Sequence, residues 1–382
     1  MMKEFAVSTN IYFGEGALER LTALPYRKVL IFTDPFVAKS GLIRQVTDRL
    51  ERAGIRYEVD TDVVPDPPVE KVASGIAVLL KSRPDCIVAV GGGSAIDLAK
   101  AVRKSAQRVD ETCKPSLIAI PTTSGTGSEV TSFAVVTDRE KGVKYPLVAP
   151  DMVPDEAILD VEMVKSVPAG VTADTGMDVL THAMEAYVST AANDFSDALA
   201  EKAVSLVGQY LLRSQANAED TEAREKMHTA ACLAGLAFNA VSLGLNHGMA
   251  HQLGAQFHIP HGRANAILLP YIVEYNAAIG PREVPAGEYS PCVRKYCNLA
   301  RILGLAQNDE ATTIRALAGY IRFLNQEMGI PLRVSGTGTV GEADYLARIG
   351  TMANAALADA CTATNPRVPT AGEVMALYRK VF

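Results

Sequence analysis

The stretch DCIVAVGGGSAIDLAK (residues 85–100) decides the fold of the N-terminal half of the chain. An apolar run is followed by three glycines and then by a segment whose apolar residues have helical spacing. This order is typical of a βαβ unit, in which the free N–H groups and the positive dipole end of the helix can hold a phosphate. The sixth position of the dinucleotide-binding fingerprint is Ile96 and not glycine, so a purely structural turn remains the alternative. A P-loop is excluded, because no Gly-Lys-Ser/Thr follows.

Apolar runs of strand length alternate with helical segments on both sides of this stretch. The expected strands lie at 28–34, 56–60, 85–90 and 116–122, and the expected helices between them lie at 40–54 and 69–83. Strands that alternate with helices of this length predict a parallel sheet covered by helices.

Two further features indicate a ligand site at the carboxyl ends of these strands. PTTSGTGSE (121–129) is a second glycine-rich loop after an apolar strand, and two such loops would flank the crevice in which open α/β sheets bind ligands. Asp34 ends the strand KVLIFTD (28–34), where a carboxylate could accept hydrogen bonds from a ribose diol and repel a 2′-phosphate. Asp34 would then favour NAD over NADP. The alternative is that Asp34 only caps the next helix.

From about residue 168 onwards the sequence is almost wholly helical. Segments with apolar residues at helical spacing lie at 171–190, 196–214, 223–244, 311–329 and 342–361. Pro168 and Gly170 stand where the pattern changes. We therefore expect two domains, an α/β dinucleotide-binding domain with a parallel sheet at 1–167 and an all-α metal-binding domain at 168–382.

The helical half contains the candidate metal site. Asp178 and His182 are four residues apart and so lie on one helix face, and His247 and His251 have the same spacing. His261 follows in IPHG, where the flanking proline and glycine predict a loop. Two helices and a loop would thus supply one carboxylate and two or three imidazoles.

The residue types narrow the choice of metal. Histidine and carboxylate ligands without cysteine suit Fe²⁺ or Zn²⁺, and affinity alone does not choose between these ions because Zn²⁺ binds such ligands more tightly. The alternative for each histidine is a buried core residue, which is our interpretation of His228 and His258. Two pairs at helical spacing are harder to explain in this way.

Bulk properties exclude several other classes of protein. The net charge of −6 over 382 residues argues against nucleic acid or an anionic membrane surface as the main partner. The N-terminus has no signal-peptide pattern, and no apolar run is long enough to span a bilayer. The six cysteines are scattered, as expected of free thiols in a reducing compartment. We therefore expect a cytoplasmic protein.

Five motifs together resemble the iron-containing (group III) alcohol dehydrogenases. They are GGGSAIDLAK (91–100), PTTSGTGSEVT (121–131), TGMDVLTHAMEAYVS (175–189), NHGMAHQLG (246–254) and IPHGRANAILLP (259–270). The resemblance extends over nearly the whole chain. Within the family the sequence is most similar to the alcohol dehydrogenases of bacterial propanediol and ethanolamine utilisation, which are associated with microcompartments.

The resemblance implies a dehydroquinate synthase-like architecture, with NAD(H) and Fe²⁺ as cofactors and Zn²⁺ as the alternative metal. The metal ligands that it implies are Asp178, His182, His247 and His261. It gives His251 a part in proton transfer. The cofactor contacts that it implies are Asp34, Gly92, Gly93, Ser94, Thr122, Thr123, Thr126 and Lys144.

The sequence departs from the family pattern at several places. Phe133 stands where relatives that act on hydroxylated aldehydes carry a polar residue and, with Phe238, would favour plain alkyl aldehydes as substrates. Ala363 and Thr364 replace the two glycines of a TGGNPR motif, which puts the local backbone in question. The loop 280–291 is longer than usual and is a candidate for an interface.

These observations predict a metal-dependent NAD(H) alcohol dehydrogenase that reduces propanal and acetaldehyde to primary alcohols and regenerates NAD. The alternatives are a zinc-dependent polyol dehydrogenase of the glycerol type and a non-catalytic, NAD-binding partner of a microcompartment. The resemblance further implies a homodimer or higher homo-oligomer. It also implies a place inside a bacterial microcompartment, beside the shell or aldehyde-producing enzymes.

Overall fold

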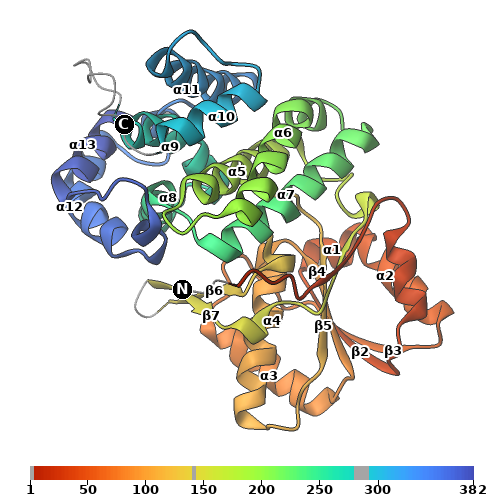
Figure 1. Cartoon of the computed structure of the whole chain (residues 1–382). Helices are drawn as coiled ribbons and strands as arrows, with labels where there is room; N and C mark the ends of the chain where they lie inside the picture. The colour runs from red at the N-terminus through yellow and green to blue at the C-terminus, as the bar shows by residue number, and fades with distance from the viewer. Residues whose placement is uncertain (1–3, 140–142, 279–291) are drawn as a thin grey trace. The chain divides into compact units, whose positions relative to one another are not determined.

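The computed structural model describes residues 4–139, 143–278 and 292–382 (Figure 1). The chain forms two compact units, Met1–Val167 and Pro168–Phe382, and each is described by itself. The loop 280–291, noted above as a departure from the family pattern, lies outside the described residues.

Unit 1 is built on a six-stranded sheet in which all paired strands are parallel. In spatial order the strands are β1 (Asn10–Phe13), β8 (Glu156–Leu159), β5 (Ser116–Pro121), β4 (Cys86–Gly91), β2 (Lys28–Thr33) and β3 (Arg56–Asp60). The four expected strands are present, and the short strands β1 and β8 extend the sheet beyond β5. Every residue of β4 is buried, as in a parallel sheet covered on both faces.

Helices cover both faces of this sheet (Figure 1). Because successive strand residues point to opposite faces, Leu30 and Ile87 pack in one core with α3 and α4, whereas Ile31 and Val88 pack in the other with η1 and α2. The helices are η1 (Ala17–Ala23), α1 (Pro35–Ser40), α2 (Leu42–Arg52), α3 (Val69–Ser82) and α4 (Gly93–Val109). The antiparallel hairpin of β6 (Phe133–Asp138) and β7 (Val143–Val148) and the 3₁₀ turns η2 (Ser128–Val130), η3 (Pro150–Met152) and η4 (Val161–Met163) complete the unit.

Every regular element in the described part of unit 2 is a helix, which confirms the predicted all-α fold of this half. Its helices are α5 (Ala169–Val188), α6 (Asp194–Ala216), α7 (Thr221–Val241), α8 (Leu245–Phe257), α9 (His261–Asn276), α10 (Val293–Ile302), α11 (Glu310–Glu327), η5 (Val334–Thr337), α12 (Glu342–Ala358), η6 (Ala360–Thr364) and α13 (Ala371–Val381).

One local expectation in unit 2 is wrong. The sequence IPHG was expected to be a loop, but α9 begins at His261 and Pro260 is its N-cap. Gly262 lies inside the first turn of this helix. A Cβ atom there would lie 2.1 Å from the carbonyl oxygen of Asp174 on α5, so the glycine serves close helix packing and not a loop.

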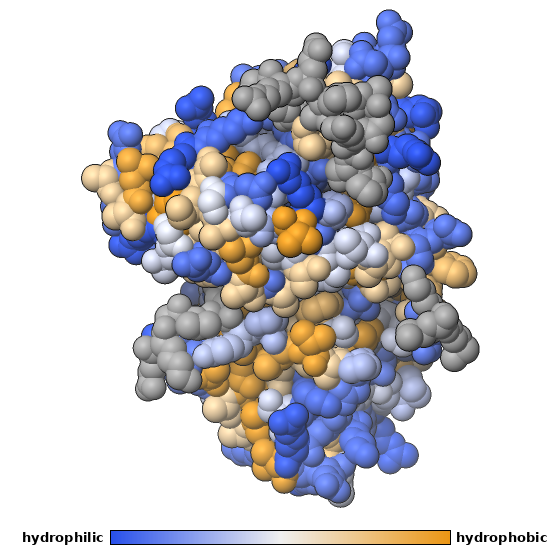
Figure 2. Space-filling model, turned by 60° about the vertical axis from the view of Figure 1, so that its left-hand side comes forward, coloured by the Kyte–Doolittle hydropathy of each residue, from blue (hydrophilic) through white to orange (hydrophobic). Residues whose placement is uncertain are grey.

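Three further properties of the described residues are the length and apolarity of the helices, the exposed apolar side chains and the state of the cysteines. Among the described helices none alone has the length and apolarity of a membrane span, and α7 and α8 reach them only as a pair bent by 107°. Large exposed apolar side chains such as Phe13, Phe195 and Val368 come from separate parts of the chain, and hydrophilic residues lie among the apolar ones on the face in Figure 2. All six cysteines are free, as predicted.

Candidate functional site

Three helices bring four potential metal ligands together. Asp178 and His182 lie one turn apart on α5. His247 lies in the first turn of α8, and His261 begins α9. One ligand atom of each side chain lies within 4.8 Å of the others, and the Nε2 atoms of His247 and His261 lie 3.6 and 3.5 Å from Asp178 Oδ1. Donors about 2.1 Å from one tetrahedral ion would be about 3.4 Å apart, so these spacings fit a single divalent cation.

The electrostatics of this cluster also suit a cation. Burial raises the pKa of Asp178, but the neighbouring His182 and His261 lower it well below its usual range, so Asp178 is a carboxylate. Burial lowers the pKa of His247, but hydrogen bonds with Asp178 and Glu185 outweigh this effect and raise it to about 9. A bound cation would take the place of that proton. The side chain of His261 is 42% exposed and forms the open edge of the cluster.

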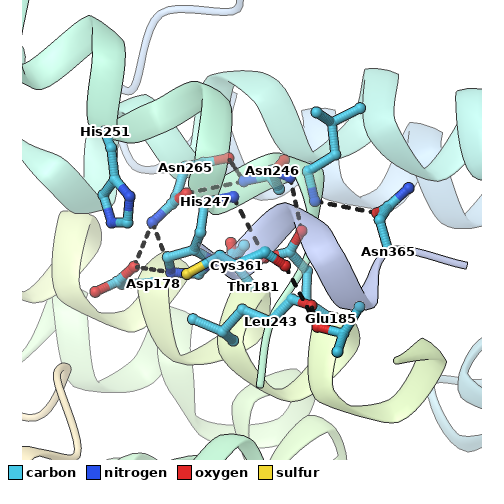
Figure 3. A network of polar contacts seen from close by, with 12 residues as sticks. Asp178, Thr181, Glu185, Leu243, Asn246, His247, His251, Asn265, Cys361 and Asn365 are labelled. Carbon is cyan, nitrogen blue, oxygen red and sulfur yellow. Dashed lines mark hydrogen bonds and ion pairs between the residues drawn. The ribbon is translucent and has the colours of Figure 1, made fainter. Parts of the chain in front are cut away.

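Glu185 orients His247 and was not singled out from the sequence. Its Oε2 atom lies 2.6 Å from His247 Nδ1, and its Oε1 atom accepts a 2.7 Å hydrogen bond from the backbone N–H of Asn246 (Figure 3). A carboxylate on Nδ1 leaves Nε2, the atom that faces Asp178, free to bind a metal. Glu185 follows His182 by three residues on α5, which is the signal that could have identified it.

Asn265 is a second missed residue, one turn after His261 on α9. Its Nδ2 atom donates a 2.7 Å hydrogen bond to Asp178 Oδ1 and lies 3.1 Å from His247 Nε2 and 3.2 Å from His261 Nε2. Its Oδ1 atom accepts a 2.9 Å hydrogen bond from Asn246 Nδ2, which fixes the orientation of the amide. The Asn265 amide nitrogen therefore lies within 3.2 Å of ligand atoms of three of the four candidate side chains, and Figure 3 shows it beside Asp178 and His247.

His251 lies beside the four-residue cluster and not within it. Its ring is stacked on that of His261, with centroids 5.4 Å apart, and its Nδ1 atom lies 2.7 Å from Asp359 Oδ2. Burial raises the pKa of Asp359, but the hydrogen bond with His251 lowers it to about 2. Asp359 immediately follows α12 and is far from the other motifs in sequence, so no spacing pattern points to it.

The two histidines interpreted as buried core residues, His228 and His258, lie outside the cluster. His228 on α7 is buried, and burial lowers its pKa to about 4. The core interpretation is wrong for His258, which is exposed and is the left-handed C-cap of α8. Phe238, predicted to line a substrate pocket, is almost fully buried and stacks on His182 with ring centroids 4.6 Å apart. Phe133, the other residue of that prediction, belongs to unit 1, where it is half-buried at the start of β6.

In unit 1 the two glycine-rich loops lie against each other. Gly92 is the N-cap of α4, and the backbone N–H of Thr122 donates a 3.0 Å hydrogen bond to the carbonyl of Gly91. A Cβ atom on Gly93 would lie 2.8 Å from Thr126 Cγ2, and one on Gly92 would lie 3.3 Å from Thr123 Oγ1. The predicted phosphate-binding residues of the two loops are therefore in direct contact.

Asp34 caps the next helix, which was the alternative interpretation offered for it. Its Oδ1 atom caps α1 by accepting hydrogen bonds of 2.8 and 2.9 Å from the N–H groups of Phe36 and Val37. Its Oδ2 atom faces the first glycine turn, 3.5 Å from where a Cβ atom on Gly91 would lie.

Ser94 and Lys144 are the last two predicted cofactor residues. Ser94 Oγ accepts a 3.2 Å hydrogen bond from the backbone N–H of Asp66. The backbone of Lys144 pairs with Thr137 in the β6–β7 hairpin, and its side chain lies outside the described part.

Ala363 and Thr364 fit the backbone without glycine. Neither residue has a positive φ angle. Both lie in η6, where the Oγ1 atom of Thr364 donates a 2.6 Å hydrogen bond to the carbonyl of Leu243 just before α8. The departure from TGGNPR therefore adds a hydrogen bond to the segment that leads into α8, the helix that carries His247.

Comparison with known proteins identifies the family. Residues 8–161 match "Iron-containing alcohol dehydrogenase", and residues 172–382 match "Fe-containing alcohol dehydrogenase family, C-terminal". The chain is 43% identical to the 1-propanol dehydrogenase PduQ of Citrobacter freundii over the whole of both chains, and 37% identical to the NADPH-dependent butanol dehydrogenase of Clostridium saccharobutylicum, covering 98% of it. The structure of sulfoacetaldehyde reductase from Bifidobacterium kashiwanohense in complex with NAD⁺ matches all of this chain and 99% of its own, with 29% identity and a TM-score of 0.86. The chain belongs to the iron-containing alcohol dehydrogenases.

Proposed function

We propose that this alcohol dehydrogenase uses Fe²⁺ and NADH to reduce short-chain aldehydes, propanal and acetaldehyde among them, to primary alcohols. The observation that carries the proposal is the convergence of one buried carboxylate and three imidazoles, with a second carboxylate, that of Glu185, behind His247. Similarity to a 1-propanol dehydrogenase and a butanol dehydrogenase supports the substrate class.

The metal would be held by the four clustered side chains. They are Asp178, His182, His247 and His261. The chemistry supplied by the bound ion is Lewis-acid stabilisation of negative charge on the carbonyl oxygen. Glu185 keeps the imidazole of His247 oriented through Nδ1, Asn265 holds Asp178 Oδ1, and Phe238 supports His182 by stacking. Fe²⁺ is our assignment from the family, and Zn²⁺ suits the same ligands.

His251 would supply the proton that the alcohol product needs. The imidazole is partly exposed, so it can exchange protons with solvent, and Asp359 holds its Nδ1 atom. The Nε2 atom is then left for the proton transfer. Because the ring stacks on that of His261, the proton would be released next to the metal ligands.

The dinucleotide would bind at the two glycine-rich loops of unit 1. The N-terminus of α4 offers free N–H groups to the pyrophosphate, and the contacts would be made by Gly92, Gly93, Ser94, Thr122, Thr123, Thr126 and Lys144. Asp34 places a carboxylate beside the first turn, where it would repel a 2′-phosphate and favour NADH. The relative that binds NAD⁺ in its solved structure supports this preference, whereas the butanol dehydrogenase is NADPH-dependent.

Phe133 and Phe238 would give the substrate pocket its apolar character and so favour alkyl aldehydes over polyols. We further propose a homodimer or higher homo-oligomer inside a bacterial microcompartment, on the strength of the motifs shared with the propanediol and ethanolamine utilisation enzymes.

The test is NADH oxidation by protein stripped of metal and reloaded anaerobically with Fe²⁺ or Zn²⁺. Turnover of propanal and acetaldehyde that appears with Fe²⁺ supports the proposal. Turnover of glycerol with Zn²⁺ and NAD⁺, without aldehyde reduction, would instead identify a polyol dehydrogenase. Absence of turnover with either metal would leave a non-catalytic NAD-binding protein.

A further inference from the structure

Helix α4 carries a lysine in the interior of unit 1 that the proposed mechanism does not use. Lys100 is completely buried. Burial lowers its pKa to about 8 against the opposing effect of Asp97 and Glu129, so its ammonium group is still mostly charged at pH 7. A buried charge is costly unless all its donors find partners, so the contacts of Lys100 show what it is used for.

All three contacts of the Lys100 ammonium group lie on one downstream segment. Its Nζ atom donates hydrogen bonds to Ser128 Oγ at 2.9 Å, to Thr131 Oγ1 at 3.1 Å and to the carbonyl oxygen of Phe133 at 2.8 Å. An ammonium group has three donors, so all of them are used. They join α4 to the end of the second glycine-rich loop and to the first residue of β6.

Asp97 lies one turn earlier on α4 and binds the same segment. Its Oδ1 atom accepts a 2.5 Å hydrogen bond from Ser128 Oγ, and its Oδ2 atom accepts a 3.0 Å hydrogen bond from the backbone N–H of Val135. Ser128 is therefore held from two sides, as an acceptor for Lys100 and a donor to Asp97.

The segment held by Lys100 and Asp97 is in direct contact with the first glycine-rich loop. Ser128 donates a 3.2 Å backbone hydrogen bond to Thr126 Oγ1, and the Thr126 side chain is the group that a Cβ atom on Gly93 would meet at 2.8 Å. Gly93 opens α4, the same helix that carries Lys100. The contacts thus run from Lys100 on α4 to Ser128 and Thr126 in the second loop, and from Thr126 back to Gly93 at the start of α4. This closed series of contacts sets the spacing of the two glycine-rich loops.

We infer that Lys100, assisted by Asp97, is a positioning residue for the dinucleotide: it holds the second glycine-rich loop at the distance from the first that the pyrophosphate requires. This inference rests on the proposed function, because it assumes that NADH binds at these loops. An apolar side chain would fill the same volume but would leave Ser128, Thr131 and the Phe133 carbonyl without this anchor.

The test compares Lys100→Met with Lys104→Met. Lys104 lies one turn further along α4, is partly exposed and pairs with Asp151 at the surface, so it is a matched control. For each metal-loaded variant one would measure the Kd of NADH by fluorescence titration, the KM for NADH, kcat and the melting temperature. Thr131→Val, which removes one of the three acceptors and keeps the shape, is the milder variant.

We expect Lys100→Met to raise the Kd and the KM for NADH at least about tenfold, with kcat changed less. Tenfold is the lower bound, because the loss of even one of the three hydrogen bonds to this charged group would have about that effect. Thr131→Val should shift the same constants in the same direction by a smaller factor, and Lys104→Met should leave them unchanged. A folded Lys100→Met variant with wild-type Kd and KM, altered only in melting temperature, overturns the inference. If Lys100→Met does not fold, the inference is overturned by a Thr131→Val variant whose KM for NADH equals that of the wild type. Failure of the wild type itself to bind NADH would refute the proposed function instead.

Discussion

Replacing Glu185 by glutamine tests whether the carboxylate behind His247 sets the affinity of the metal site. The carboxylate accepts from His247 Nδ1 at 2.6 Å and from the Asn246 N–H at 2.7 Å, so both of its oxygens face donors. Glutamine has only one oxygen. If the oxygen stays with Asn246, the amide NH₂ faces Nδ1, which must then give up its proton and leave Nε2 protonated. If the amide turns round, the Asn246 N–H loses its acceptor.

In both orientations a neutral amide replaces the carboxylate on Nδ1, which makes the imidazole less basic and so weakens metal binding. In the second orientation the unpaired Asn246 N–H also costs about 1–3 kcal/mol of folding stability, with or without metal. Loss of the partner that orients a metal-binding histidine typically costs about 10–100-fold in affinity, which corresponds to about 1.4–2.7 kcal/mol. We therefore expect Glu185→Gln to bind Zn²⁺ or Fe²⁺ about 10–100-fold more weakly than the wild type.

The affinity would be measured by competition with a chromogenic chelator, with Zn²⁺ in air and with Fe²⁺ under anaerobic conditions. Glu225→Gln on α7 is the matched control, because that carboxylate is partly exposed and pairs only with the adjacent Lys226 among the described ion pairs. Metal affinity equal to that of the wild type in Glu185→Gln would refute the reasoning. An equal loss in Glu225→Gln would show that the effect is not specific to the site.

Three further predictions concern other parts of the site. His251→Ala should lower kcat about 100-fold or more while the metal content, measured by elemental analysis, stays at the wild-type level; metal loss would make His251 a ligand. Asp34→Gly should raise the kcat/KM ratio of NADPH to NADH and cost only about a few tenths of a kcal/mol of stability, because glycine is itself a tolerated N-cap; an unchanged ratio would end the cofactor role of Asp34. Because the pKa of His247 is about 9 without metal, metal must displace its proton at pH 6–8, so affinity should fall about tenfold per pH unit on acidification and level off above pH 9. Chelator competition at pH 6.5, 7.5 and 8.5 tests this, and a flat profile contradicts it.

The parts of this protein that follow a short-range pattern could be predicted from its sequence. The alternation of apolar strands and amphipathic helices predicts the parallel sheet, and the four-residue spacing places Asp178 with His182 on one helix face. Glu185, Asn265 and Asp359 were missed for different reasons. Helical spacing puts Glu185 on the face of His182 and Asn265 on the face of His261, but a polar residue there has the same local pattern whether that face is buried or exposed. No spacing links Asp359 to the other motifs.

A glycine follows each of the two candidate ligand histidines on α8 and α9, in the dipeptides His247–Gly248 and His261–Gly262. A Cβ atom on Gly248 would lie 2.2 Å from Thr362 Oγ1, and one on Gly262 would lie 2.1 Å from the Asp174 carbonyl, one turn before Asp178. Any side chain at position 262 would push the first turn of α9 away from α5 and take the imidazole of His261 away from the carboxylate of Asp178. The glycine that suggested a loop in the sequence therefore helps to build the candidate metal site, because it sets how closely α5 and α9 approach each other.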